Sequence, residues 1–178
     1  VSGIADIHIG DTICSLNNPV AIPFQKISEP TLSMDFMVND SPLAGKEGKF
    51  VTSRHLRDRL FKELNTDVSL RVEETPGVEN SFKVSGRGEL HLSVLIENMR
   101  REGYEFAVSK AEVLYKKDEN GKLLEPIETA YIDVPDEFTG TVIDKLSQRK
   151  GELQNMSASN GTTTRLEFSI PARGLIGY

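Results

Sequence analysis

The spacing of apolar residues between positions 30 and 109 constrains the fold more than any other feature of this sequence. Alternating apolar residues predict strands, and apolar residues three and four apart predict helices. The predicted elements, in chain order, are a strand, a helix, two strands, a helix and a strand at 30–40, 50–64, 68–74, 81–86, 89–102 and 104–109. The order β-α-β-β-α-β is typical of the ferredoxin-like arrangement, in which two helices cover one face of an antiparallel sheet.

The last third of the chain repeats the start of this order. After a turn at Asn120-Gly121, the pattern predicts a strand, a helix with Val142, Ile143 and Leu146 facing inward, and a hairpin around Asn160-Gly161. The segments FKVSGRGELHL and FSIPARGLIGY both place Arg-Gly and an apolar pair directly after the third strand of their unit. The sequence therefore predicts an α+β chain with two tandem ferredoxin-like domains, the second of them truncated.

The first 27 residues follow a different pattern. Ile7, Ile9 and Ile13 alternate with polar residues around a Gly-Asp turn, and the stretch is too short to fold alone. We therefore expect residues 1–27 to be the end of a β domain, which the resemblance described below implies to be the last strands of a β-barrel. Residues 28–116 are predicted to be the first ferredoxin-like domain and residues 117–178 the truncated second one.

Composition excludes several classes of protein. The formal net charge is -6 and the pI about 5.2, which argues against a DNA- or RNA-binding protein that works through an overall positive field. Cys14 is the only cysteine, so an internal disulfide and cysteine-ligated zinc or iron–sulfur sites are excluded. No apolar run approaches the ~20 residues that span a bilayer, and the first residues lack the pattern of a signal peptide. We expect a cytoplasmic protein without a membrane partner.

Two glycine-rich segments invite a nucleotide-binding interpretation, but neither fits. GRGELH lacks the third glycine of the dinucleotide fingerprint, because His91 occupies that position. LAGKEGKF lacks the first glycine of a phosphate loop and has Phe50 where that loop needs a hydroxyl residue. We instead expect Gly86 and Gly88 to make a sharp turn into the second helix, where a Cβ would clash or φ is positive. That helix is expected to end just before Gly103 and to carry four apolar residues on one face: Leu90, Val94, Leu95 and Met99.

Catalytic and metal-binding patterns are weak. The three histidines, His8, His55 and His91, follow no metal-ligand spacing, and Ser85 does not lie in a nucleophile elbow. The neighbouring carboxylates Glu73 and Glu74 point to opposite faces of a strand. We expect no catalytic residue, no cofactor-binding residue and no metal ligand in this chain.

Local basic clusters are more informative. Residues 46–62 hold six Lys or Arg against Glu47 and Asp58, a local balance of +4. Arg54 and Arg57 lie off the predicted apolar stripe, where they can meet phosphates. A second basic group, Arg149 and Lys150, ends the helix of the last unit. Two other interpretations remain open: a solvated outer helix face for the first group, and complementation of the helix dipole for the second.

Several segments resemble a known family. GRGELHLSVLIENMRREGYEF is similar to the third domain of the translational GTPases related to elongation factor G. DVPDEFTG, KLSQRKGE and RLEFSIPARGLIGY are similar to the TypA/BipA branch of that group, and the resemblance extends over nearly the whole chain. IADIHIGDTICS is similar to the end of the barrel domain of these factors. One departure is Ala111, where the family usually has proline.

The resemblance implies the C-terminal part of a GTP-binding translation or ribosome-assembly factor that acts in stress or cold adaptation. The chain lacks the phosphate loop and the base-reading motif, so GTP and magnesium are expected only in a preceding domain, and this chain is not expected to be an enzyme. The implied partner is the ribosome, through ribosomal RNA and proteins, with a monomeric chain and no DNA. Charge placement gives six candidates for RNA contact: Arg54, Arg57, Arg149, Lys150, Arg165 and Arg173.

Two alternatives remain open from the fold alone. One is a tandem ferredoxin-like module that binds a small regulatory ligand. The other is an acylphosphatase-like enzyme, because that fold can hold a phosphate between an arginine loop and an asparagine. Both rest on fold analogy, which is a weak guide to function.

Overall fold

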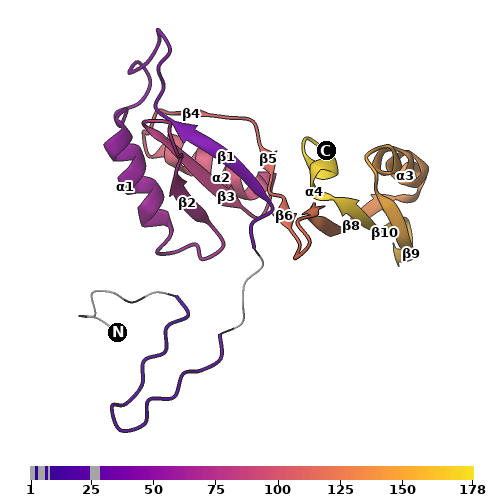
Figure 1. Cartoon of the computed structure of the whole chain (residues 1–178). Coiled ribbons are helices and arrows are strands. Elements are labelled where there is room, and N and C mark those ends of the chain that lie inside the picture. Colours follow the sequence, from indigo (N-terminus) through magenta and orange to yellow (C-terminus); the bar gives the residue numbers. More distant parts are fainter. Residues whose placement is uncertain (1–2, 4–6, 8, 25–28) are drawn as a thin grey trace. The chain divides into compact units, whose positions relative to one another are not determined.

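The structure is a computed structural model that describes residues 3, 7, 9–24 and 29–178 (Figure 1). The described part of the chain divides into two compact units. The first contains the described residues up to 30 together with 34–110, and the second contains 31–33 and 111–178. This division falls six residues before the predicted boundary at 116, and the predicted domain limits themselves stay predictions.

The first unit follows the predicted order of elements. They are β1 (Leu32–Met37), α1 (Ser53–Glu63), β2 (Arg71–Glu74), β3 (Ser81–Gly86), α2 (Glu89–Arg101) and β4 (Ala107–Val108). The strands lie in the order β2-β3-β1-β4, and the β1–β4 and β2–β3 pairs are antiparallel. Leu32 and Ser33 at the start of β1 belong to the second unit, where they pair antiparallel with β5 (Glu112–Val113). The predicted α+β fold with antiparallel, ferredoxin-like sheets is confirmed.

Alternation along the strands builds the core of this unit. Val72 pairs with Val84 across β2 and β3 and both are buried, whereas the neighbouring Glu73 pairs with Lys83 on the opposite face. The helices add a further set of buried residues: Leu56, Leu60, Leu92, Leu95 and Met99. Burying each of these aliphatic side chains stabilises the unit by about 1.5–3 kcal/mol before the cost of ordering the chain.

The buried face of α2 differs from the predicted one. Leu90 and Val94 were expected to face inward, but 78% of Leu90 and 50% of Val94 is exposed. Leu92 is fully buried in their place, next to Leu95 and Met99 at helical spacing. The prediction was wrong for Leu90 and Val94. Apolar residues recur at helical spacing in two overlapping sets, one with Leu90 and one with Leu92, and periodicity alone does not show which set is buried.

Local signals set the helix ends. The side chain of Thr52 caps α1 by accepting a hydrogen bond from the backbone N–H of His55 at 3.3 Å. Gly103 follows α2 with a φ of +93°, the left-handed conformation that commonly ends helices and that glycine adopts without strain. The predicted role of Gly103 at the end of the second helix is therefore confirmed.

The second unit repeats the first half of the same topology. Its elements are β6 (Lys116–Lys117), β7 (Leu123–Leu124), β8 (Ile127–Pro135), a 3-10 turn (Asp136–Phe138), α3 (Thr139–Gln148), β9 (Glu152–Asn160), β10 (Thr163–Pro171) and α4 (Ala172–Leu175). β10 lies between β8 and β9 and is antiparallel to both. β6 and β7 form the hairpin predicted at Asn120-Gly121. α4 follows β10 as α2 follows β3 in the first unit.

The core of the second unit is small. Leu166, Phe168 and Ile170 alternate along β10 and are fully buried, with Leu146 of α3 and Val134 of β8 beside them. Val142 and Ile143 are partly buried against this cluster, so the predicted inward face of α3 is confirmed. The cluster places the ends of α3 and β10 side by side, which positions the residues described below.

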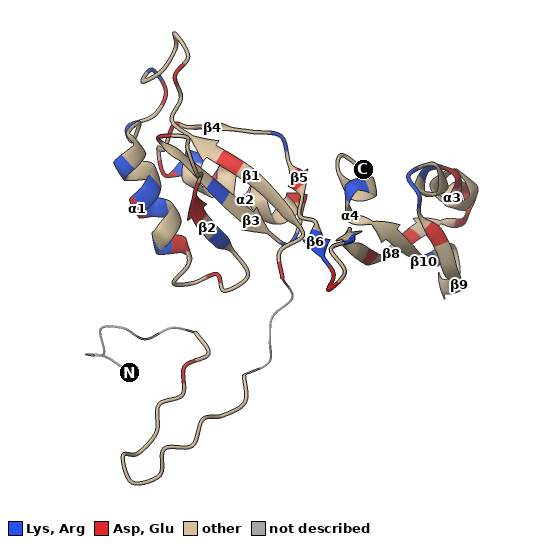
Figure 2. Ribbon diagram, viewed as in Figure 1, with Lys and Arg blue, Asp and Glu red and all other residues tan. Residues whose placement is uncertain are grey.

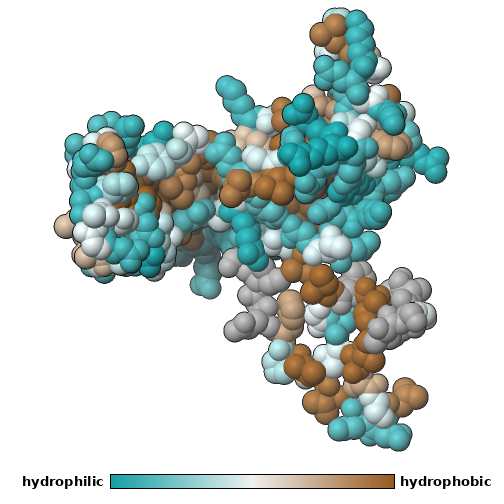
Figure 3. Space-filling view, turned by 180° about the vertical axis from the view of Figure 1, so that it is seen from behind, coloured by the Kyte–Doolittle hydropathy of each residue, from teal (hydrophilic) through white to brown (hydrophobic). Residues whose placement is uncertain are grey.

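The stretch before β1 has a different character. Residues 9–24 form no strand, and Figure 3 shows apolar side chains gathered along this segment. Six large apolar residues are more than half exposed here: Ile9, Ile13, Leu16, Val20, Ile22 and Phe24. The remaining residues of the predicted barrel segment, apart from 3 and 7, lie outside the described residues, so the barrel strands stay a prediction.

Candidate functional site

The basic face predicted for α1 exists. The side chains of Arg54 and Arg57 on this helix are both exposed, and Figure 2 shows Lys and Arg positions in blue along α1. The Arg54 side chain is 89% exposed and its Nε lies 3.9 Å from a carboxylate oxygen of Asp58. Exposed pairs of this kind contribute about 0–1 kcal/mol, so this guanidinium can exchange its partner for a phosphate at little cost.

Arg57 is held more firmly. Its Nε donates a hydrogen bond of 3.1 Å to Glu74 on β2, and its guanidinium lies 5.0 Å from the centre of the Phe61 ring. A groove of about 860 Å³ opens beside Arg54 and Arg57, and its other wall includes Glu74 and Glu79. The groove carries both signs of charge, so only its α1 side suits a polyanion.

Arg59 belongs to the same basic run but is not part of that face. Its side chain is only 11% exposed and pairs with Glu102 at 2.6 Å and with Glu63 at 2.5 Å. The hydrogen bond to Glu102 is the main reason that the Arg59 pKa is raised, and it lowers the pKa of Glu102 in turn. Arg59 therefore ties α1 to the end of α2, and the positive charge available on α1 is smaller than the sequence suggested.

Arg149 makes contacts inside the second unit. Its Nη1 donates hydrogen bonds to the backbone oxygens of Gly174 at 2.9 Å and Ile176 at 3.0 Å, and its guanidinium lies 5.2 Å from the centre of the Tyr178 ring. The segments KLSQRKGE and PARGLIGY, which are far apart in the sequence, meet at this point. Arg149 is partly buried and acts first as a positioning residue for the last residues of the chain.

Glycine is required where these two segments touch. A Cβ on Gly174 would lie 2.6 Å from the backbone oxygen of Arg149 and 3.1 Å from Ile170 Cγ1. A Cβ on Gly151 would lie 2.9 Å from the backbone oxygen of Leu146. Between these contacts Lys150 adopts a left-handed φ of +69° and is exposed. The junction thus presents Lys150 outward while it turns Arg149 inward.

The other two candidates are paired with acids. Arg165 on β10 donates from Nε and Nη2 to both carboxylate oxygens of Asp133 on β8, at 2.8 and 2.7 Å. Arg173 on α4 donates from Nε to Glu125 at 2.8 Å. These hydrogen bonds raise the pKa of each arginine and lower that of Asp133. Both arginines lie at the surface, but binding a phosphate there competes with an existing partner.

Gly86 has the expected structural role, for one of the two expected reasons. A Cβ on Gly86 would lie 2.8 Å from Leu92 Cδ2 and 2.9 Å from His91 Nδ1, so the helix approaches the strand closely. Gly86 does not have the left-handed φ that was the other expected reason. A Cβ on Gly88 would meet no atom within 4 Å, and the Gly88 φ of 178° is extended backbone, so neither reason applies to Gly88.

His91 is held in a structural pair. Its Nδ1 accepts the backbone N–H of Arg87 at 3.2 Å, so Nε2 carries the proton and donates to Asp67 at 2.5 Å. Burial opposes the charged form of Asp67, but hydrogen bonds from Ser69 and His91 outweigh it and lower the pKa of Asp67. The pair fastens the start of α2 to the loop after α1. In the part of the chain that the structure describes, no group of three or more His, Cys, Asp or Glu is placed to hold a metal ion.

Sequence reasoning missed a polar site that surrounds the carboxylate of Glu105. Its Oε1 accepts hydrogen bonds from Asn39 Nδ2 at 2.8 Å and the Gly45 N–H at 2.7 Å. Its Oε2 accepts the N–H groups of Glu47 at 3.1 Å and Gly48 at 2.9 Å. The donors, first the Gly45 N–H, lower the pKa of Glu105 from 4.5 to about 2. The sequence pointed to this site only through Gly45 and Gly48, which lie in the segment LAGKEGKF that was rejected as a phosphate loop.

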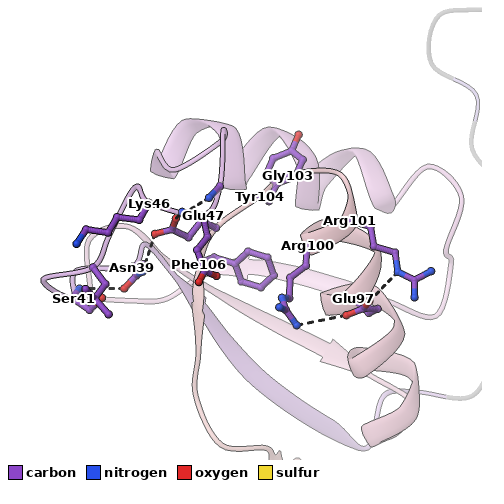
Figure 4. Close-up of a pocket in the computed structure, with 13 residues that line it drawn as sticks. Asn39, Ser41, Lys46, Glu47, Glu97, Arg100, Arg101, Gly103, Tyr104 and Phe106 are labelled. Carbon is purple, nitrogen blue, oxygen red and sulfur yellow. Dashed lines mark hydrogen bonds and ion pairs between the residues drawn. The ribbon is translucent and has the colours of Figure 1, made fainter.

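A cleft of about 580 Å³ opens beside this carboxylate (Figure 4). Figure 4 shows Asn39, Lys46 and Glu47 at one end and Arg100 and Arg101 of α2 at the other. Both arginines pair with the single carboxylate of Glu97, at 3.6 and 2.8 Å. Because two positive charges share one acid, one of them stays available to a ligand.

Comparison with known proteins identifies the relatives of this chain. The family described as elongation factor G C-terminus matches residues 122–178. Three proteins named large ribosomal subunit assembly factor BipA align with all 178 residues: those of Synechocystis sp. at 54% identity, Bacillus subtilis at 53% and Escherichia coli K12 at 51%. The resemblance to the TypA/BipA branch is confirmed.

The alignment also shows how much of the relatives is represented. The chain spans 30% of the Synechocystis protein and 29% of the other two. A crystal structure from Thermus thermophilus aligns with 89% of this chain and 38% of its own, at 14% identity and a TM-score of 0.48, which is too low to support an argument. No helix among the described residues is both long and apolar enough to cross a membrane.

Proposed function

We propose that this chain is a ribosome-docking part of a GTP-binding factor that assists assembly of the large ribosomal subunit. The observation that carries the proposal is the identity of 51–54% with BipA assembly factors over all 178 residues. Identity at this level across both units implies that the surfaces, as well as the fold, serve similar partners. The action is cytoplasmic, and the chain docks as a monomer.

Hydrolysis of GTP takes place elsewhere in the whole protein. The chain has no phosphate loop motif. In GRGELH, Gly86 packs against the start of α2, and in LAGKEGKF the backbone N–H groups bind the Glu105 carboxylate. GTP and magnesium therefore bind a preceding domain, and this chain contributes no catalytic residue. Its part is to hold the ribosome and to pass on the nucleotide state by movement of whole domains, in a factor used under stress or in the cold.

Contact with ribosomal RNA uses the exposed cations that have the weakest partners. Arg54 and Lys150 fit this description best, and Arg57 follows because its partner Glu74 is itself exposed. Arg165 and Arg173 contribute only if RNA displaces Asp133 and Glu125. Arg149 supports Lys150 indirectly, since it holds the turn from which Lys150 projects.

Co-sedimentation with purified large ribosomal subunits over a salt series tests the proposal. The test variant carries Arg54→Glu, Arg57→Glu and Lys150→Glu, and it leaves Arg149 intact because that residue holds the C-terminal segment. The control carries Lys110→Glu, Lys117→Glu and Lys122→Glu, which changes the net charge equally. We expect saturable binding that weakens with salt, is reduced at least tenfold in the test variant and is nearly unchanged in the control.

Two outcomes would contradict parts of the proposal. Absence of saturable binding to either ribosomal subunit at low salt would refute docking by this chain. Equal losses in the test and control variants would refute the residue assignment while docking stands. No specific observation favours the small-ligand module or the acylphosphatase-like enzyme. Hydrolysis of acetyl phosphate by the chain would be evidence for the acylphosphatase-like enzyme.

A further inference from the structure

The loop 39–48 forms a receptor for an anion, and a side chain of the same chain fills it. The backbone N–H groups of Gly45, Glu47 and Gly48 converge with the Asn39 amide on the two oxygens of Glu105. Successive backbone N–H groups that point into one concavity are a general solution for binding anions, phosphate included. The segment LAGKEGKF does not match a phosphate-loop motif, but its backbone N–H groups bind an anion as such a loop does. Here the anion is a carboxylate.

The loop is built for this close approach. Gly45 has a φ of +79°, which other residues adopt only under strain, and it directs its N–H at Glu105. A Cβ on Gly48 would collide with the backbone and Cβ of Glu105. Both glycines therefore let the loop approach residue 105 closely enough for its N–H groups to reach the carboxylate.

The occupant resembles a phosphate group in the way it accepts hydrogen bonds. Each carboxylate oxygen accepts two of them, and a phosphodiester likewise presents two non-bridging oxygens that share one negative charge. Glu105 is only half-buried and adjoins the open cleft, so solvent ions reach the same donors. Lys46 at the rim and the arginine pair that shares Glu97 supply positive charge for a more highly charged ligand.

We propose that this receptor is an exchangeable phosphate site, in which a backbone phosphate of ribosomal RNA replaces the Glu105 carboxylate on docking. The inference rests on the proposed ribosome-docking function and names a contact within it. In the free chain Glu105 keeps the loop ordered and neutralises its donors. On the ribosome the carboxylate turns into solvent, the four donors bind the phosphate oxygens, and Lys46 approaches the same phosphate. No covalent bond changes.

A titration of the ¹⁵N-labelled full chain with inorganic phosphate, followed by NMR, tests the site directly. The variant Glu105→Ala removes the occupant, and Glu47→Ala is the matched control because it removes one negative charge from the same cleft but keeps its N–H. We expect the amide signals of Gly45, Glu47 and Gly48 to shift saturably in Glu105→Ala. The dissociation constant should be about tenfold or more below that of the unchanged chain, and Glu47→Ala should resemble the unchanged chain.

A second variant controls for the possibility that Glu105→Ala disorders the loop. Glu105→Gln keeps an acceptor oxygen that can hold the loop but lacks the negative charge, so it should bind phosphate more tightly than the unchanged chain. If the loop signals of Glu105→Gln are native-like and neither variant responds to phosphate, the proposal is overturned. A gain in Glu47→Ala equal to that in Glu105→Ala also overturns it, since a general charge effect then explains the binding.

A short single-stranded RNA distinguishes a backbone phosphate from free phosphate. We expect the same three amide signals to respond to the RNA in Glu105→Ala, and Lys46→Ala added to that variant to weaken the response several-fold. A response to inorganic phosphate without one to RNA refutes the RNA assignment. Co-sedimentation of the unchanged chain with ribosomes tests the proposed function separately, so the two ideas fail in different experiments.

Discussion

Replacing Gly174 with alanine tests the packing that joins the end of α3 to the end of the chain. The added Cβ would lie 2.6 Å from the Arg149 backbone oxygen and 3.1 and 3.2 Å from Ile170 Cγ1 and Cδ1. The nearest of these atoms is a backbone oxygen and Ile170 is fully buried, so α4 must move by several tenths of an ångström. Overpacking of this kind typically costs about 1–3 kcal/mol.

Gly140 provides the matched control. A Cβ at Gly140 in α3 meets no atom within 4 Å, and its backbone is helical. The change Gly140→Ala should therefore stabilise the second unit by roughly 0.5–1 kcal/mol, since alanine loses less backbone entropy in a helix. The two variants, which have the same composition, should then differ in free energy of unfolding by roughly 1.5–4 kcal/mol.

Urea denaturation combined with hydrogen exchange measures this difference. With a urea dependence of about 1–3 kcal/mol/M, the midpoints of the two variants should differ by about 1 M. Exchange of the buried β10 amides at Leu166, Phe168 and Ile170 assigns the change to the second unit. A Gly174→Ala variant as stable as the unchanged chain, beside a Gly140→Ala variant that gains stability, would refute the packing of α4 against Arg149.

The remaining predictions concern three other contacts. Leu92→Ala should lower the free energy of unfolding of the first unit by about 2–5 kcal/mol, measured by urea denaturation. Leu90→Ala should change that free energy by less than about 0.5 kcal/mol. Equal effects of the two variants would refute the observed buried face of α2. Arg149→Ala should destabilise the second unit by about 1.5–3 kcal/mol through two lost hydrogen bonds from a charged donor, and Lys150→Ala by much less. The pKa of Glu105 is about 2 in the folded chain and ordinarily 4.5, so the stability from this carboxylate is complete above about pH 4.5 and is lost as the pH falls toward 2. Glu105→Gln should flatten the decline of the urea midpoint over that pH range, and an unchanged decline would refute the role of the carboxylate.

The basic residues of α1 show what the sequence could and could not predict about candidate RNA contacts. Runs of Lys and Arg predicted that α1 carries a basic face, and Arg54 and Arg57 do lie on it. The same run contains Arg59, whose partner Glu102 is 43 positions away. Because a count of charges along the chain does not include partners from other elements, it overestimated the free positive charge.

The same limit applies to the glycines. The sequence indicated that Gly86 serves a close approach, and the structure confirms this. Sequence reasoning also dismissed LAGKEGKF, although Gly45 and Gly48 close an anion receptor there. The anion comes from Glu105, 57 to 60 positions further along the chain, and no motif built from neighbouring residues includes it.

The sequence by itself determined the kinds of element, their order and the resemblance to the TypA/BipA branch. These follow from periodicity and from short motifs, which depend on residues within a few positions of each other. Only the tertiary structure decided that α2 buries Leu92 and exposes Leu90, that Arg149 turns inward while Lys150 stays outside, and that Glu105 occupies the loop receptor. Each of these outcomes depends on distances between side chains on different elements, and those distances are set by the packing of the whole unit.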